Sequence, residues 1–188
     1  SPHPRLPATK TFFFPGFTER TGGVVIEQGL LQARDGWGGE DRARFLTNLG
    51  ADPKAPFSLF FFSYPEAPVE DLARSLAADP RPLQVLAAPG AASLKLGEAL
   101  ARLQAPQVAF RQLPAVPQIE FDRLLWSADA LIIRGEDSFV RAQLAAKPFL
   151  WTIYKQEENA HIVKLKAFMD RIGQAFSPEV NAAWQEMS

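Results

Sequence analysis

Charged and hydroxyl side chains gather at one point of the sequence, where an apolar run ends. The stretch ALIIRGEDSFVRAQLAAKPFLW, residues 130–151, places Arg134, Glu136, Asp137 and Ser138 around a single glycine. The first N–H groups of a helix lack intrahelical partners and attract anions. Neighbouring carboxylates are suited to accept hydrogen bonds from sugar hydroxyls. These residue types at this spacing predict a site for phosphate and sugar groups.

The same residues also have a purely structural explanation. Asp137 or Ser138 is a good N-cap for the helix that follows. Arg134 is within reach of an ion pair with Asp129 or Glu136, and an acid in a first helical turn is favoured by the helix dipole. Local sequence alone leaves the two explanations nearly equal.

The elements that must position these residues alternate along the chain from Phe57 onward. Apolar runs typical of strands cover residues 57–63, 83–88, 107–113, 130–134 and 148–153. Helical patterns cover residues 66–78, 91–104, 119–128, 138–146 and 158–176. Strands separated by helices predict a parallel sheet, and continuous apolar runs predict helices on both of its faces. The fold class is therefore α/β, a Rossmann-like, doubly wound parallel sheet.

A doubly wound sheet of five strands has the default order 3-2-1-4-5, and its ligand crevice opens between the carboxyl ends of strands one and four. Strand one ends at Tyr64, and strand four ends at Arg134 to Asp137. The loop LPAVPQ, residues 113–118, and Tyr154 lie on the same rim. Topology thus converges on the same residues as local chemistry. Neither GxGxxG nor a P-loop is present, so the sequence supports neither a dinucleotide dehydrogenase nor a P-loop NTPase.

Composition narrows the functional class. The chain has 188 residues and a formal net charge of −1, so no basic field for nucleic acid is expected. It has no cysteine, and His3 and His161 are too few for a histidine metal centre. No apolar run is long enough for a membrane span, and no secretory leader is visible. We expect a soluble cytoplasmic domain without metal, nucleic-acid or membrane partners.

The first part of the chain lacks the rhythm of a parallel sheet. Residues 9–29 suggest two strands around a turn at Gly22 and Gly23, and residues 39–50 suggest a short helix closed by Gly50. We therefore expect a lead-in over residues 1–55 and a nucleotide-sugar-binding domain over residues 56–188.

Three stretches resemble one known family, the bacterial elongation factor P arginine rhamnosyltransferases. They are FFFPGFTERTGG at residues 12–23, VPQ at 116–118, and LLWSADALIIRGEDSFVRAQLAAKPFLWTIYKQ at 124–156. The resemblance covers nearly the whole chain but only the C-terminal, donor-binding half of the family. It implies the C-terminal domain of a GT-B glycosyltransferase, with the lead-in near the interdomain cleft.

The resemblance also implies a reaction. The family transfers L-rhamnose from TDP-β-L-rhamnose to an arginine of elongation factor P, with inversion and without metal or other cofactor. Such a displacement needs a base or orienting carboxylate at the guanidinium and neutralisation of the departing diphosphate. The family's carboxylates for the first task lie in its N-terminal half, so no catalytic residue is expected in this chain, which we expect to be inactive alone.

Residue roles for the second task follow from the resemblance. Arg134 is expected beside the diphosphate, the amides of Asp137 and Ser138 on the phosphates, and Glu136 on the ribose. The remaining donor-binding candidates are Tyr64 and Tyr154 as hydroxyl donors, Phe62 near the donor, and Gln118 at the thymine edge. Each has a structural rival: the tyrosines as aromatics that cover the sheet end, Phe62 as a packing residue, and Gln118 as a helix cap.

Two positions depart from the family pattern. Ala115 stands where the family usually carries a phenylalanine beside the base, and Lys155 replaces a usual proline. Both bear on affinity rather than on the family itself. Two other functional classes stay open at this point, a non-catalytic interaction module and a different nucleotide-sugar enzyme such as another GT-B transferase or an epimerase.

Overall fold

The chain is described here from a computed structural model, which covers residues 7, 11, 14, 16, 18–154, 160–173 and 177–179. It forms two compact units, residues 1–38 and 39–188. The predicted division into residues 1–55 and 56–188 stays a prediction, but the helix expected at residues 39–50 belongs to the second unit.

The first unit contains one short helix, α1 (Leu30–Asp35), which the sequence did not predict. Two backbone hydrogen bonds close a turn, from Gly16 N to Gly23 O at 3.0 Å and from Gly22 N to Phe14 O at 2.9 Å. No strand forms among the described residues of this unit. The strand expected after Gly23 is therefore absent, and most of the strand expected before Gly22 lies outside the described residues.

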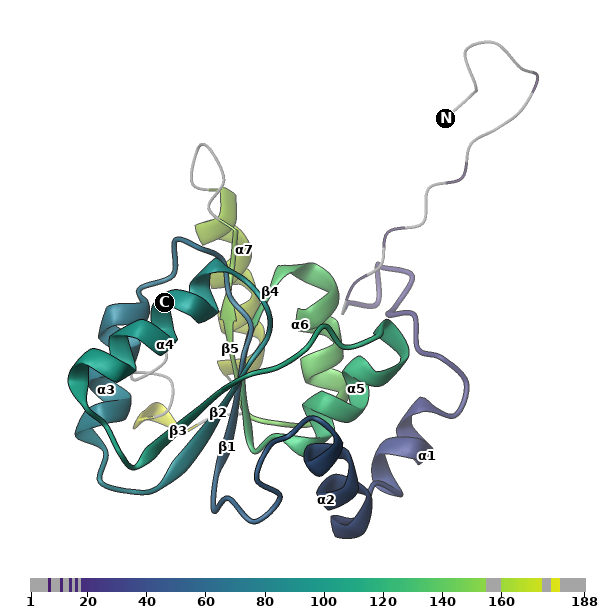
Figure 1. The fold of residues 1–188 in the computed structure, drawn as a ribbon. Coiled ribbons are helices and arrows are strands. Elements are labelled where there is room, and N and C mark those ends of the chain that lie inside the picture. The colour runs from purple at the N-terminus through teal and green to yellow at the C-terminus, as the bar shows by residue number, and fades with distance from the viewer. Residues whose placement is uncertain are drawn as a thin grey trace. The chain divides into compact units, whose positions relative to one another are not determined.

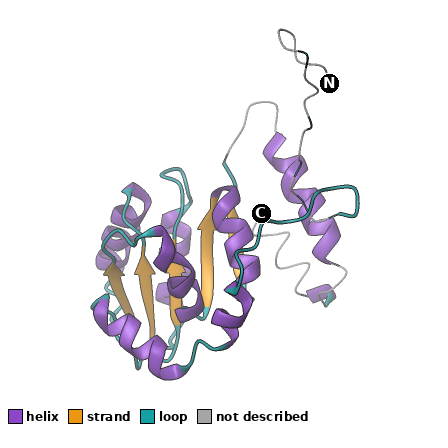
Figure 2. Cartoon of the chain, turned by 90° about the vertical axis from the view of Figure 1, so that its right-hand side faces the viewer, coloured by secondary structure: helices purple, strands orange, loops and turns teal. Residues whose placement is uncertain are grey.

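The second unit is built on a five-stranded parallel sheet with the order β3-β2-β1-β4-β5. Each pair of neighbouring strands is parallel, and the arrows visible in Figure 2 point the same way. The predicted strand order is confirmed. The strands are β1 (Ser58–Phe61), β2 (Leu83–Ala87), β3 (Val108–Gln112), β4 (Ala130–Arg134) and β5 (Phe149–Thr152).

Helices cover both faces of this sheet. The helices α3 and α4 lie on one face, and α5 and α6 lie on the other (Figure 1). This arrangement follows from right-handed crossovers that run in opposite directions from β1. The helices of the unit are α2 (Gly39–Asn48), α3 (Val69–Ala78), α4 (Ala91–Leu103), α5 (Gln118–Ser127), α6 (Gly135–Leu144) and α7 (Ala160–Ile172).

The central strands are buried on both faces, as their unbroken apolar runs predict. Phe60 and Phe61 are adjacent on β1 and are 0% and 1% exposed. Phe61 belongs to the core beneath α3 and α4. Phe60 faces the other way and meets Phe121 of α5 edge-on, with ring centroids 6.0 Å apart.

An aromatic cluster fastens α7 to the edge of the sheet. Phe139 of α6 stacks on Trp151 of β5 at 4.0 Å, and Phe168 of α7 meets Phe139 edge-on at 4.5 Å. The apolar side chains of α7 face inward only in part: Phe168 is 9% exposed, whereas Ile162 is 52% exposed.

A polar network around Arg42 of α2 lies at the amino-terminal ends of β1 and β4. Its guanidinium donates to Ser127 O at 2.9 Å, to Pro53 O at 3.0 Å and to Ser58 Oγ at 3.0 Å. The Asp129 carboxylate lies 3.6 Å from the guanidinium and accepts the Ser58 amide at 2.7 Å. One arginine therefore joins α2, β1 and the loop before β4.

Replacing this arginine should destabilise the fold. Arg42→Ala leaves partly buried acceptors and Asp129 without their partner, so we expect a loss of about 2–4 kcal/mol in the free energy of unfolding. Urea titration followed by far-UV circular dichroism measures this loss.

The matched control is Arg102→Ala, which removes an exposed ion pair with Glu70. Its expected cost is below about 1 kcal/mol. Equal losses in the two variants would contradict the structural role of the Arg42 network.

Candidate functional site

A cavity of about 450 Å³ opens at the carboxyl end of the sheet, on the side of α5 and α6. This volume lies in the range of small-molecule sites. Apolar side chains form much of its wall, and polar groups enter from α5 and α6. The lining residues are Phe60, Phe62, Ala88, Pro89, Leu113, Pro114, Ala115, Val116, Gln118, Phe121, Leu124, Asp137, Ser138 and Arg141.

Four of the eight predicted donor-binding residues line this cavity: Phe62, Gln118, Asp137 and Ser138. The other four do not line it. They are Tyr64, Arg134, Glu136 and Tyr154, which follow the ends of β1, β4 and β5 at the same edge of the sheet. The predicted residues therefore form two groups at the same end of the sheet, four that line the cavity and four that lie outside its lining.

The turn from β4 into α6 positions the polar residues. The helix begins at Gly135, three residues earlier than predicted, and Arg134 is its extended N-cap. Gly135 has a φ of +71°, a conformation that side-chain-bearing residues rarely adopt. A helix that starts here leaves the N–H groups of Gly135, Glu136 and Asp137 without intrahelical acceptors.

This start removes the structural explanation of Asp137 and Ser138 as caps. No side chain makes a capping hydrogen bond to the α6 N-terminus. Ser138 is 9% exposed, and its hydroxyl lines the cavity without a hydrogen bond to another described residue. Its amide lies one position past the free N–H groups, so its hydroxyl is the group available to a ligand.

Arg134 is held by aromatic rings and not by an acid. Its guanidinium carbon lies 4.3 Å from the centre of the Phe62 ring and 4.9 Å from that of Tyr64. One guanidinium nitrogen donates to Ser63 O at 3.3 Å. The rival ion pairs do not form: Asp129 pairs with Arg42, and Glu136 pairs with Lys164 at 3.9 Å. Within the described chain, Arg134 has no carboxylate partner.

The two predicted tyrosines contact each other. Tyr64 and Tyr154 meet edge-on, with ring centroids 5.4 Å apart. Burial raises the pKa of the Tyr64 hydroxyl above its ordinary value; the Glu136 carboxylate adds to the rise, and Arg134 opposes it. The Tyr64 hydroxyl is therefore protonated at neutral pH and able to donate a hydrogen bond.

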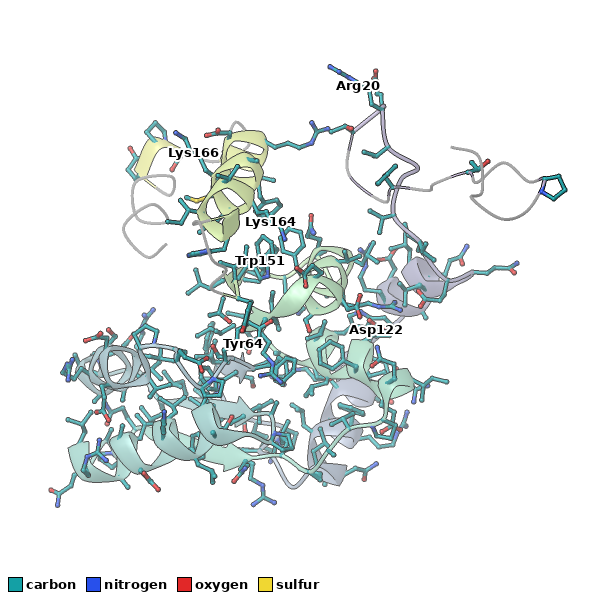
Figure 3. The ribbon with its side chains drawn as sticks, turned by 90° about the horizontal axis from the view of Figure 1, so that it is seen from above. Arg20, Tyr64, Asp122, Trp151, Lys164 and Lys166 are labelled. Carbon is teal, nitrogen blue, oxygen red and sulfur yellow. The ribbon has the colours of Figure 1, made fainter. Side chains whose placement is uncertain are left out.

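Trp151 supports the α6 turn from β5. Its indole N–H donates to Gly135 O at 3.0 Å, while its ring stacks on Phe139. Figure 3 looks down on this edge of the sheet and labels both Tyr64 and Trp151. The sequence did not identify this role, because a tryptophan in an apolar strand reads as core.

Two further cavity residues were missed. Phe121, three residues after Gln118, turns its ring toward Phe62 at 6.4 Å between centroids. Arg141 pairs with Asp122 at 3.3 Å, and both are less than one-fifth exposed. The signal for both was their spacing, since Phe121 and Arg141 each lie one helical turn beyond a predicted site residue.

Of the two departures from the family pattern, Ala115 lines the cavity, which agrees with a place beside a ligand. Lys155 lies outside the described residues.

The described residues contain no group of three or more histidine, aspartate or glutamate side chains placed to hold a metal ion. None of the described helices has the length and hydropathy that crossing a membrane requires.

Comparison with known proteins identifies relatives of the whole chain. A family model described as "Elongation-Factor P (EF-P) rhamnosyltransferase EarP" matches residues 1–188. The chain is 42% identical over 186 residues to a protein-arginine rhamnosyltransferase of Pseudomonas putida, across 93% of this chain and 49% of that protein. It is 35% identical over 199 residues to one from Neisseria meningitidis serogroup B, across 100% of this chain and 51% of that protein.

The chain thus spans about half the length of the curated relatives it matches. A solved structure from work on the "structural basis for EarP-mediated arginine glycosylation of translation elongation factor EF-P" aligns with it at a TM-score of 0.78 and 36% identity. That alignment covers 93% of this chain and 58% of the solved chain. The chain therefore belongs to the EarP family of elongation factor P rhamnosyltransferases, and its five-stranded unit has the α/β fold of a GT-B glycosyltransferase domain.

Proposed function

We propose that this chain is the donor-binding half of a protein-arginine rhamnosyltransferase and that it binds TDP-β-L-rhamnose. One observation carries the proposal: a cavity of nucleotide size lies beside an arginine without a carboxylate partner and beside the free amides of α6. An apolar pocket next to an anion site matches the two parts of a nucleoside diphosphate.

The nucleoside occupies the cavity in this proposal. Phe62 and Phe121 offer aromatic surface, and Gln118 supplies an amide at the rim for the edge of the thymine. Glu136 accepts hydrogen bonds from the ribose hydroxyls. Its carboxylate is largely exposed, so its pair with Lys164 is weak and gives way to a ligand at little cost.

The diphosphate lies across the α6 N-terminus. The amides of Gly135 to Asp137 and the hydroxyls of Ser138, Tyr64 and Tyr154 donate to its oxygens, and Arg134 supplies a full positive charge. Charge-assisted hydrogen bonds of this kind are about twice as strong as neutral ones. They also stabilise the extra negative charge that appears on the diphosphate as the bond to the sugar breaks.

The reaction is a single displacement. A guanidinium nitrogen of an arginine of elongation factor P attacks the anomeric carbon, TDP departs from the opposite side, and a carboxylate outside this chain orients the guanidinium and takes its proton. The residues described here serve only the departing side. We therefore propose that the 188 residues bind the donor but do not turn it over.

The nearest alternatives are an interaction module that binds no nucleotide and an enzyme for another nucleotide sugar. Thermal unfolding with TDP, UDP and GDP separates them. A rise in melting temperature with TDP alone supports the proposal. A rise with UDP or GDP favours an enzyme for another nucleotide sugar, and no rise with any of the three favours the interaction module.

The 188-residue chain should bind TDP and transfer no rhamnose. At a hundredfold excess of TDP over its dissociation constant, binding stabilises the fold by about 2.7 kcal/mol. Mass spectrometry of elongation factor P incubated with the chain and TDP-rhamnose should find unmodified arginine. Detection of rhamnosyl-arginine would contradict the assignment of the acceptor-side carboxylate to another part of the enzyme.

Removing the charge of Arg134 should weaken the binding of the diphosphate much more than the binding of the nucleoside. We expect Arg134→Ala to weaken TDP by tenfold or more and thymidine by less than twofold, because only TDP carries phosphate. Isothermal titrations of both ligands at low and high salt measure the effect, and the loss for TDP should shrink as salt screens the charge.

The control for this prediction is Arg102→Ala, which removes the same charge from α4 at an exposed site outside the cavity lining. It should leave both affinities within twofold. Equal weakening of TDP and thymidine by Arg134→Ala would show that the turn has a structural role only.

Adding an aromatic ring at position 115 should tighten nucleoside binding. Ala115 lines the cavity near Phe121, and stacking of a base on an aromatic side chain is worth about 1–3 kcal/mol in nucleic-acid systems. We expect Ala115→Phe to strengthen thymidine and TDP by similar factors, and Ala115→Leu to have a smaller effect. Weaker or unchanged binding by the phenylalanine variant would exclude this loop from the thymine pocket.

A further inference from the structure

The guanidinium of Arg134 lies against two aromatic rings that belong to one strand end. Phe62 and Tyr64 follow β1 two residues apart, and their ring centres lie 4.3 Å and 4.9 Å from the guanidinium carbon of Arg134. Arg134 ends the neighbouring strand β4, which pairs in register with β1 through Phe60↔Leu131 and Phe61↔Ile132. The parallel pairing brings Arg134 level with Ser63, whose carbonyl accepts a hydrogen bond from the guanidinium at 3.3 Å. From this position the long arginine side chain reaches both rings.

The groups that contact the Arg134 guanidinium determine how much of its positive charge remains available to a ligand. Arg42 shows the other mode in the same unit: Asp129 beside it compensates its charge. The rings of Phe62 and Tyr64 attract a cation through their quadrupoles and carry no net charge. They fix the position of the Arg134 guanidinium and leave its full positive charge available.

A second contact steadies one of the rings. Tyr154 packs edge-on against Tyr64 from the end of β5, and Gly135 leaves room beside the Tyr64 hydroxyl, which would lie 3.5 Å from a side-chain carbon at that position. The clamp of Phe62 and Tyr64 around Arg134 thus draws on the ends of β1, β4 and β5, the three strands that border the α6 turn.

We propose that Phe62 and Tyr64 are positioning residues that clamp the Arg134 guanidinium between their rings, so that an uncompensated positive charge meets the diphosphate already oriented. This inference rests on the proposed function of the site. It gives the ring of Tyr64 a role that is separate from the hydrogen bond its hydroxyl donates, and it gives Phe62 a role toward the cation in addition to the aromatic surface it offers to the nucleoside.

Two variants of Tyr64 isolate the ring. Tyr64→Phe keeps the ring and removes the hydroxyl, whereas Tyr64→Leu removes both and stays apolar. The comparison is between these two variants, so any contribution of the hydroxyl cancels. In titrations of the 188-residue chain, the leucine variant should bind TDP about fivefold more weakly than the phenylalanine variant. Their affinities for thymidine should agree within twofold, a pattern that a general loss of folding does not produce.

A double-mutant cycle tests whether the ring acts through the cation. In the Arg134→Ala background the difference in TDP affinity between Tyr64→Phe and Tyr64→Leu should fall to within twofold, because the clamped group is gone. A fivefold difference that persists without Arg134 would overturn the clamp, as would equal TDP affinities of the two variants when the unmutated chain binds TDP.

The clamp also has a readout without ligand, which separates its failure from that of the proposed function. In ¹H–¹⁵N spectra the Arg134 Nε–H should carry a ring-current shift that Tyr64→Phe keeps and Tyr64→Leu reduces. Loss of this difference overturns the clamp even if TDP binds. Absence of TDP binding by the unmutated chain overturns the proposed function, and with it the role of the clamp in orienting a diphosphate.

Discussion

The parallel pairing of β1 with β4 is the constraint on which the rest of the site depends. From this pair the crossovers run to opposite faces of the sheet, so no helix covers the line where the two strands end. The residues after β1 and the turn into α6 lie on that line, and the loop after β3 and Tyr154 after β5 flank it at the same ends of the strands. A sheet with any other strand order would place these segments apart.

The second consequence of this pairing is electrostatic. A charged group packed against the end of a central strand is surrounded by other residues, and its partner determines whether it serves stability or binding. At the amino edge Arg42 meets Asp129, hydroxyl and carbonyl oxygens, so its charge is used within the fold. At the carboxyl edge Arg134 meets aromatic rings and a single carbonyl. The same residue type thus has two uses at the two ends of one sheet.

The strand order, and with it the end of the sheet where the cavity opens, was predictable because apolar runs in a parallel sheet are long, unbroken and separated by breakers. The start of α6 was not predictable, since a glycine between a strand and a helix is typical of a loop. The hydrogen bond from Trp151 to the Gly135 carbonyl is tertiary and cannot be inferred from the local sequence. Phe121 and Arg141 were missed because helical residues are assigned to a face only when the neighbouring elements are known. The short helix α1 has six residues and no buried side chain, so it carries no apolar period.

The separation of the Arg42 network from the cavity has an evolutionary consequence. The two lie at opposite ends of the same strands, and no residue of the network lines the cavity. Mutations at the amino-terminal ends of the strands therefore act on the thermal tolerance of the protein, while those at the carboxyl ends act on the candidate site. A lineage that moves to a hotter or colder habitat is free to retune the first without losing the second.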